Sequence, residues 1–473
     1  MASPNISFNS IPSSIRKPGK YFEYNAALAV RSLPTNLQRV LIVAQMRTGG
    51  TAVANTVIQV FDSETAATLF GRGSQAHRMV RAALNANRYV QLFVLPVADN
   101  GAGVVATATL TFAGTATTAG AVYLNVAGVD VVVPVSVGDT AAVVATNVNA
   151  ALVLLINLPV SEGVAGAVVT LTQLNKGMVG NAHRLTASSS ATGITATPTA
   201  FASGLNDPAL ATPLANAFTG GHEIVVVPYT AGTPLTDLKA HLVSVSGPME
   251  RRPAIGVYAS GGTLSAATTQ AGTLNSERMT TVLLKNTITA AEEIAAAYAA
   301  VLAFEEDPAR PLNTLALTGV TAPLIADRLS RTEQETCLAN GVTPLEWGPG
   351  DVVQIVRAVT TYTVNPASVL DVAWLDLTTM RTMDYCMKAW RTRVELRFPR
   401  DKLSVRTAAR VRSELLDVAY RLEELEIIEN VDLWKADLVV ERDSQDNNRL
   451  NAKIPVDVVN GLHVFAGRLD LIL

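Results

Sequence analysis

The sequence of 473 residues predicts a multidomain protein of α/β and α+β class. An α/β domain is interrupted by a mostly β insertion and is followed by an α+β domain. Three observations predict this. Strand-like and helix-like stretches alternate before residue 101 and after residue 220. Between these positions the chain has only six charged residues and is rich in Ala, Gly, Thr and Val. Charged residues become frequent again from residue 378 onward.

The α/β domain is expected over residues 21–98 and 217–305. Its apolar runs predict buried strands and its capping residues mark helix starts, with Asp62 or Ser63 before the first helix. We expect strands at 39–44, 89–95, 223–228, 254–258 and 280–284, and helices at 63–69, 74–85, 235–245, 265–274 and 290–304. Glu292 and Glu293 lie in the first turn of the last helix, where carboxylates favour the helix dipole.

The insertion is expected over residues 99–216. Alternating apolar residues predict short strands at 106–112, 121–126, 131–135 and 168–174, and Asp139 or Thr140 starts a helix over 141–154. The insertion is expected to end in a loose linker, residues 188–216. A domain can interrupt another because the two ends of a folded domain often lie close together.

The third domain is expected over residues 306–473. We expect strands at 315–317, 438–442 and 452–456, a hairpin formed by 345–347 and 352–363, and helices at 326–339, 378–393 and 407–425. The last helix carries an apolar stripe, which comprises Val411, Leu415, Val418, Leu422 and Leu425. Its other face carries Arg410, Glu414, Asp417, Arg421 and Glu424, with the pairs Arg410–Glu414 and Asp417–Arg421 at helical spacing.

Both ends of the chain read as extended segments. Three prolines prevent a helix in residues 1–20, whose apolar side chains are Ile6, Phe8, Ile11 and Ile15. Residues 462–473 alternate like a strand, with Arg468 and Asp470 on one face; the apolar residues singled out here are Val464, Leu469, Leu471 and Leu473. This strand has no hairpin partner after it, so it pairs with an earlier strand, with a late-folding sheet edge or with another molecule, and we expect the last of these.

Composition and motifs argue against several functional classes of protein. A net charge of −3 with 16% charged residues does not indicate nucleic-acid binding, and no membrane span or secretory signal is apparent, so we expect a cytoplasmic protein. The two cysteines, Cys337 and Cys386, have no metal or redox spacing. The glycines at 71 and 73 join two helices, unlike a dinucleotide loop, and the five histidines are scattered. We predict no catalytic residue, no cofactor and no metal site.

Ordered motifs along the whole chain resemble the tail sheath proteins of Mu-like contractile-tailed phages and prophages. The residues that carry the resemblance are 6–12, 16–19, 176–181, 223–229, 275–276, 307–312, 360–362, 398–403, 440–442 and 448–450. The resemblance implies a virion structural protein that forms hexameric rings stacked on a tail tube and contracts to drive the tube through a cell envelope. It implies an outer α/β domain, an inner C-terminal domain, and terminal strands exchanged between subunits.

The implied partners are neighbouring sheath subunits, the tail tube protein, and baseplate and tail terminator proteins, without nucleic acid or membrane insertion. The implied location is the virion tail, after assembly in the host cytoplasm. The charged helix face at 410–424 is expected to contact the tube or the next ring. Two other classes stay open at this point: an α/β enzyme with an accessory β domain, and a surface adhesin or carbohydrate-binding particle protein.

Overall fold

The computed structural model describes residues 14–22 and 33–472. The chain divides into two compact units. Of the described residues, the small unit comprises 14–22, 33–35, Met387–Glu424 and Val431–Pro455, and the large unit comprises Asn36–Cys386, Leu425–Asn430 and 456–472. Each unit is described by itself below.

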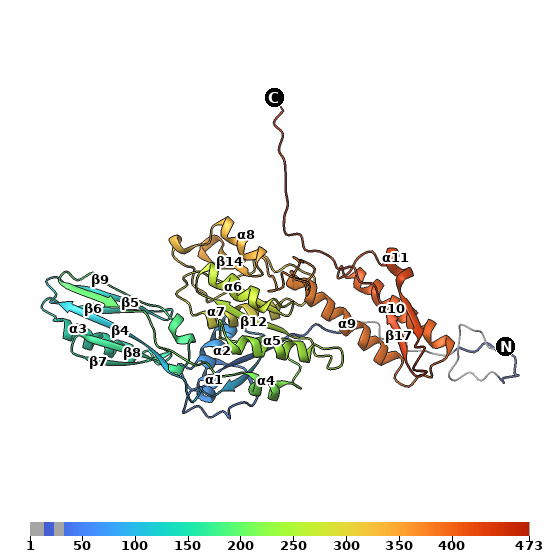
Figure 1. Ribbon diagram of the computed structural model, residues 1–473, viewed down its shortest axis with the longest axis horizontal. Coiled ribbons are helices and arrows are strands. Elements are labelled where there is room, and N and C mark those ends of the chain that lie inside the picture. Colours follow the sequence, from blue (N-terminus) through green and yellow to red (C-terminus); the bar gives the residue numbers. More distant parts are fainter. Residues whose placement is uncertain (1–13, 23–32, 473) are drawn as a thin grey trace. The chain divides into compact units, whose positions relative to one another are not determined.

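An eight-stranded sheet forms the centre of the large unit (Figure 1). In sheet order its strands are β15 (Val353–Ile355), β14 (Thr343–Trp347), β13 (Met279–Leu283), β12 (Ile255–Ser260), β11 (Ile224–Val226), β1 (Arg39–Gln45), β3 (Gln91–Val97) and β2 (Ile58–Val60). The six strands from β14 to β3 are parallel, and β15 and β2 pair antiparallel at the two edges. Helices cover both faces, which explains why the central strands are apolar runs without alternation.

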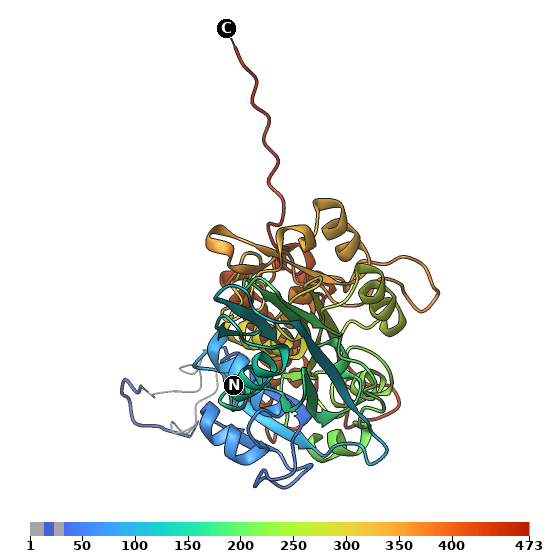
Figure 2. The same ribbon diagram turned by 90° about the vertical axis from the view of Figure 1, so that its left-hand side faces the viewer.

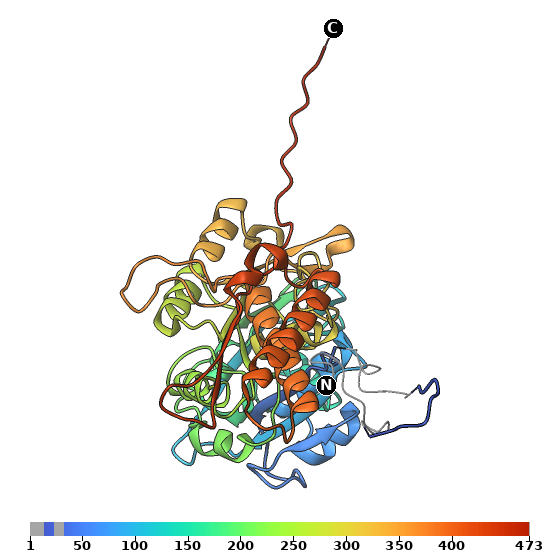
Figure 3. The same ribbon diagram turned by 90° about the vertical axis from the view of Figure 1, so that its right-hand side faces the viewer.

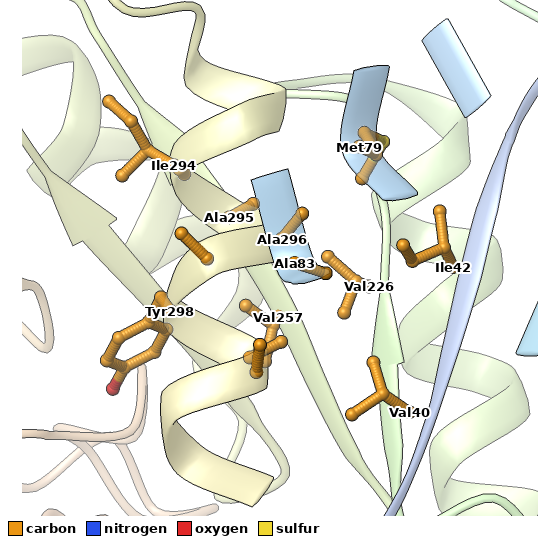
Figure 4. Close-up of a cluster of buried hydrophobic side chains, with 14 of the residues drawn as sticks. Val40, Ile42, Met79, Ala83, Val226, Val257, Ile294, Ala295, Ala296 and Tyr298 are labelled. Carbon is orange, nitrogen blue, oxygen red and sulfur yellow. The ribbon is translucent and has the colours of Figure 1, made fainter. Parts of the chain in front are cut away.

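The two faces of the sheet divide the side chains of β1. Val40 and Ile42 pack toward α1 (Ser63–Phe70), α2 (Gln75–Ala86) and α7 (Ala291–Phe304), in the core that Figure 4 shows around Met79, Ala83 and Tyr298. Leu41 and Val43 pack toward α4 (Ala211–Ala217) and α5 (Thr233–Val245) on the opposite face. Helix α7 is buried for almost its whole length, because its alanines let α2 and the sheet approach closely.

The starts of these helices follow the sequence closely. Asp62 caps α1 by accepting a hydrogen bond from the Thr65 amide, and Ser74 caps α2 by accepting one from the His77 amide. The large unit also contains α6 (Leu264–Leu274), which Thr263 caps, and α8 (Arg331–Ala339), which starts with a capping box formed by Ser330 and Glu333. The predicted alternation of strands and helices is therefore confirmed on both sides of the insertion.

The insertion leaves the sheet after β3 and has a hydrophobic core of its own. In Figure 2 its blue-green strands face the viewer. One sheet has the order β10 (Ile194–Pro198), β4 (Val105–Gly114), β8 (Val168–Lys176) and β7 (Val160–Ala165). The other has the order β6 (Val129–Val135), β5 (Gly120–Val126) and β9 (Leu185–Ser189). Helix α3 (Ala141–Val153) packs against β4, β6, β7 and β8. Strands therefore make up most of the regular structure of the insertion.

The expected loose linker over residues 188–216 is wrong. β10 pairs with β4 along five residues, the end of β9 lies in the same stretch, and α4 follows. β7 was also missed. These strands consist largely of Ala, Ser, Thr and Gly, whose weak strand signal is overridden by pairing with the apolar strands β4, β5 and β8.

The α/β sheet continues past the boundary expected at residue 306. β14 pairs parallel with β13, and β15 returns as its hairpin partner, so residues 306–386 belong to the large unit. Residues 315–317 form only a bridge, Ala316 to Gln354, and the second hairpin strand is shorter than expected. A parallel pair formed across about 60 residues of chain leaves no local signal, which explains the displaced boundary.

The small unit contains the second part of α9 (Leu377–Arg397), followed by α10 (Val405–Glu424), α11 (Val431–Trp434) and the hairpin of β16 (Val439–Arg442) and β17 (Leu450–Lys453). Figure 3 shows α10 alongside α9, where the Trp390 indole donates to the Leu415 carbonyl. The predicted stripe is confirmed for the buried Val411, Leu415, Val418 and Leu422. It is wrong for Leu425, which lies beyond the end of α10 and is exposed.

Candidate assembly surfaces

The C-terminal segment is the most exposed apolar stretch among the described residues. Its apolar side chains are Val464, Phe465, Leu469, Leu471 and Ile472, and each is at least 79% exposed. The described residues 459–472 form no helix or strand. The described part of the expected strand, residues 462–472, thus forms no strand within one chain, although Arg468 and Asp470 still form an exposed ion pair.

Three of the four N-terminal candidates, Ile6, Phe8 and Ile11, lie outside the described residues. Leu473 at the other end of the chain also lies outside them. Ile15 is described and is exposed. Residues 14–22 form no strand or helix, and the Tyr21 hydroxyl donates a hydrogen bond to the Lys17 carbonyl. Every residue from 14 to 22 is exposed, so this part of the expected arm packs into no core.

The β16–β17 hairpin is a sheet of two strands with both outer edges unpaired among the described residues. β16 packs against α10, but Val439 at its start is exposed. A two-stranded sheet is marginally stable by itself. The sequence predicted both strands, but it did not reveal that no third strand of the described chain joins them.

The charged face of α10 is turned partly toward α9. Arg393 of α9 is buried and lies 3.0 Å from Glu414 and 2.7 Å from Asp417, and Arg397 lies 3.5 Å from Glu414. Asp417 also pairs with Arg421 at 3.1 Å, as the helical spacing predicted. Burial raises the pKa of Asp417, but hydrogen bonds from Arg421 and Arg393 outweigh it and lower that pKa overall.

The predicted Arg410–Glu414 pair is wrong, because Glu414 binds the two arginines of α9. Arg410 instead binds Asp401 at 3.1 Å and lies over the Phe398 ring at 5.3 Å. Glu424 is exposed at the end of α10 and has no polar partner among the described residues. The five residues therefore divide into an inward group, Glu414, Asp417 and Arg421, and an outward group, Arg410 and Glu424.

A buried charge cluster joins the insertion to the α/β core, and sequence reasoning missed it. Arg78 of α2 lies 3.1 Å from Glu292 and 3.2 Å from Glu293, and His183 of the insertion lies 2.7 Å from Glu292. Burial raises the pKa of Glu292, but His183 and Arg78 lower it to about 2. Perturbed groups often mark active sites, but here Arg78 and Glu292 are each 2% exposed and inaccessible to a substrate.

The other candidate chemical features are closed in the same way. Gly71 and Gly73 join α1 to α2, and the Gly73 amide donates to His77 Nδ1, so it is not free to bind a phosphate. His222 and His241 line a cavity of about 10 Å³, which has room for no more than one water molecule. Cys337 and Cys386 are buried, and burial raises the pKa of each thiol to about 12.

The described residues contain neither a metal-binding cluster nor a membrane-spanning helix. No three His, Cys, Asp or Glu side chains in residues 14–22 and 33–472 are grouped so that they could hold a metal ion. No helix in the same ranges combines the length and hydrophobicity needed to cross a lipid bilayer. The features that remain are the exposed apolar C-terminal segment, the open hairpin and the charged face of α10.

Comparisons with known proteins agree along the whole chain. Residues 208–361 match the phage tail sheath protein central domain, and residues 370–472 match the phage tail sheath C-terminal domain. The chain is 32% identical to the Mu-like prophage FluMu tail sheath protein of Haemophilus influenzae, over 99% of this chain and 100% of the relative.

Solved structures share the fold at low identity. The sheath tail protein of Desulfitobacterium hafniense has a TM-score of 0.51 at 12% identity, with 94% of this chain and 97% of that chain covered. The sheath tail protein Lin1278 of Listeria innocua has a TM-score of 0.52 at 14% identity, with 92% and 94% covered. The contracted sheath complex of an extracellular contractile injection system has a TM-score of 0.52 at 11% identity, with 98% and 99% covered.

Proposed function

The chain belongs to the family of Mu-like phage tail sheath proteins, and on this basis we propose that it polymerises as stacked hexameric rings around a tail tube and contracts to drive the tube through a cell envelope. Its relatives are structural proteins of phage tails. In this proposal the chain breaks no covalent bond and needs no cofactor. It acts in the virion tail after assembly in the host cytoplasm, beside tube, baseplate and terminator proteins.

The observation that carries the proposal is the exposed apolar segment 464–472. Burying one large aliphatic or aromatic side chain contributes about 1.5–3 kcal/mol, so five side chains left in water are a substantial unrealised stabilisation. Backbone hydrogen bonds in a strand of about five residues add about 0.5–1.5 kcal/mol each before ordering costs. Another copy of the chain supplies both contributions if it offers an open sheet edge.

The β16–β17 hairpin offers such edges. Main-chain hydrogen bonding to an added strand gives affinity, and pockets for alternate side chains give register. We propose that the C-terminal segment of one subunit and the N-terminal arm of another add to this hairpin, with Val464, Leu469, Leu471 and Leu473 of one arm and Ile6, Phe8, Ile11 and Ile15 of the other as the contacting apolar residues. One such contact is weak, but many contacts in a lattice act together.

Contraction requires contacts that differ between two states, because a ligand or neighbour shifts an equilibrium only through differential affinity. The outward residues are Arg410, which is 60% exposed beside Asp401, and the exposed Glu424, and we assign these two members of the α10 face to contacts with the tube or the next ring. Glu414, Asp417 and Arg421 support that face from inside the small unit. The exchanged arms hold the subunits together while these contacts change.

The insertion supports a second candidate, a surface adhesin. Tyr123 and Val132 are paired neighbours on β5 and β6, and both are exposed. Val104 and Leu205 also pair at the base of the insertion, so a deletion of residues 105–204 joins two adjacent chain positions. In a sheath protein this deletion leaves polymerisation intact, whereas in an adhesin the deleted domain carries the binding activity.

Polymerisation of a truncated chain tests the proposal. A variant that ends at His463 lacks the exposed segment but keeps every described helix and strand. It is expected to retain thermal unfolding and circular dichroism but to form no sheath in sedimentation and negative-stain microscopy with the tube protein. A matched variant carrying Arg468→Ala and Asp470→Ala keeps the apolar residues and is expected to polymerise. Normal sheaths from the truncated chain would refute arm exchange.

A further inference from the structure

We propose that Asn313, Arg357 and Asp376 form a clasp around His463 that fixes where the C-terminal segment leaves its own subunit, and that protonation of His463 opens this clasp. The inference rests on the proposed function, since it concerns the segment expected to be exchanged. It adds a fixed starting point for the free arm and a means of regulating it. All four residues belong to the large unit.

The chain before His463 is docked on the large unit. The Glu429 amide donates to the Asp457 carbonyl at 2.8 Å, and the Val459 amide donates to the Ile427 carbonyl at 3.3 Å. The Asn430 side-chain amide also donates to the Asp457 carboxylate at 3.0 Å. These bonds hold residues 457–459 but do not reach the residues that follow.

His463 is the last docked residue. Its side chain is 16% exposed, whereas the neighbouring Leu462 and Val464 are 78% and 79% exposed. Its Nδ1 lies 3.1 Å from the Asn313 side-chain nitrogen, and its Nε2 lies 3.8 Å from Asp376 Oδ1. Arg357 binds both oxygens of Asp376, at 2.8 and 2.7 Å, and so fixes that carboxylate. The change from docked to free therefore occurs at a single residue.

The backbone around the clasp is shaped for this contact. Thr314 has a φ of +62°, which is unfavourable for a β-branched residue, and its amide donates to the Ile355 carbonyl at 2.7 Å. This conformation turns the chain directly after Asn313. On the other side, a Cβ on Gly461 would lie 2.6 Å from Pro311 Cγ, so the close passage beside residue 311 requires glycine. Strain of this kind is kept where the surrounding structure needs it.

The chemistry of the clasp makes it sensitive to protons. An amide nitrogen only donates, so Nδ1 of His463 accepts from Asn313 and the ring proton lies on Nε2. A second proton on Nδ1 would place two donors against each other. The charged groups facing the ring are Arg357 and Asp376. Burial and then Arg357 lower the pKa of His463, and Asp376 opposes them.

The sign of the effect follows from this direction. A histidine whose pKa is lowered by docking binds protons more readily when undocked. Docking is therefore fully favoured above the ordinary histidine pKa and weakens as the pH falls below it. One pH unit below the usual value of about 6.5, the loss of docking reaches at most about tenfold. The arm is thus held less firmly in mild acid than at neutral pH.

Amide hydrogen exchange of the full-length chain tests the clasp. The measured quantity is protection of the peptide spanning residues 456–466 at pH 7.5 and 5.5, normalised at each pH to the unfolded peptide. The wild-type chain is expected to lose protection at pH 5.5 by several-fold, up to about tenfold. Asn313→Asp supplies an acceptor for the protonated ring, so its protection is expected to rise at pH 5.5. Asn430→Ala is the matched control, with lower protection but the wild-type ratio between the two pH values.

Three outcomes would overturn the clasp: no dependence of wild-type protection on pH, unchanged protection in His463→Ala, or the same pH dependence in Asn313→Asp as in the wild-type chain. Polymerisation is scored in parallel, so that the two ideas fail separately. A truncated chain that still forms sheaths refutes the exchange of arms between subunits, but it leaves the hydrogen-exchange evidence for the clasp unaffected. Loss of polymerisation on truncation together with pH-independent protection refutes the clasp alone.

Discussion

Arg78→Met tests whether the buried charge cluster holds the insertion on the α/β core. The substitution keeps a long side chain in α2 but removes the guanidinium that contacts Glu292 and Glu293. Both carboxylates are buried, and only His183 and the partly exposed Arg81 remain beside them. Each carboxylate must then stay charged with fewer partners or take up a proton.

The expected cost is large because the cluster is almost dry. Removing one partner of a buried ion pair costs about 3–5 kcal/mol, whereas an exposed pair contributes about 0–1 kcal/mol. Arg81→Met is a matched control on the same helix, since Arg81 contacts Glu293 but is 31% exposed. We therefore expect Arg78→Met to destabilise the large unit several times more than Arg81→Met does.

Tryptophan fluorescence during urea unfolding measures this difference. Trp347 and Trp374 belong to the large unit, whereas Trp390 and Trp434 belong to the small unit. Replacing the latter two by phenylalanine in all variants leaves a signal from the large unit alone. Equal stability of the two methionine variants would refute the reasoning, because it would mean that Arg78 is not the partner on which the buried carboxylates depend.

Three further predictions concern other residues. The pKa of Glu292 is about 2 in the folded chain, so its ion pairs should stabilise the fold fully only above the usual glutamate pKa of about 4.5. This contribution to the free energy of unfolding should fall by about 3 kcal/mol as the pH drops toward 2, and Glu292→Gln should flatten the slope in the same urea assay. Glu424→Lys should impair tube binding without changing thermal unfolding, whereas Glu414→Lys should also destabilise the small unit because it places a cation beside Arg393; identical unfolding of the two would contradict this. Asp62→Ala should cost about 1 kcal/mol through loss of the α1 cap, and Asp62→Asn should restore most of it in urea unfolding.

The sequence predicted well those elements whose cause is local. Asp62, one of the two expected caps, caps α1, and α2 begins within one residue of the expected start at residue 74. The buried strands β1 and β12 read as apolar runs bounded by loops. A side-chain cap and a short apolar run are both determined by neighbours in the chain. The bounds of these elements therefore agree with the structure to within a few residues.

The missed elements have causes that are distant in the sequence. Ile194–Pro198 becomes a strand because it pairs with β4, about 80 residues earlier, and β14 joins the sheet only through β13. The same holds for the charged face of α10. The spacing of four residues predicted the Asp417–Arg421 pair, but no spacing within α10 reveals Arg393 on a different helix.

The C-terminal segment differs from these elements, because its pattern has no partner among the described residues. An alternating strand pattern describes what a segment does once it has a partner, whether or not its own chain supplies that partner. Residues 464–472 keep that pattern yet remain exposed, whereas Arg78 and Glu292 carry full charges yet are buried with partners. In the interior, segments with an alternating sequence pattern form strands, whereas the C-terminal segment has the pattern but forms no strand in the described chain. In a chain whose buried charges are matched so closely, five solvated apolar side chains argue for a surface that another molecule completes.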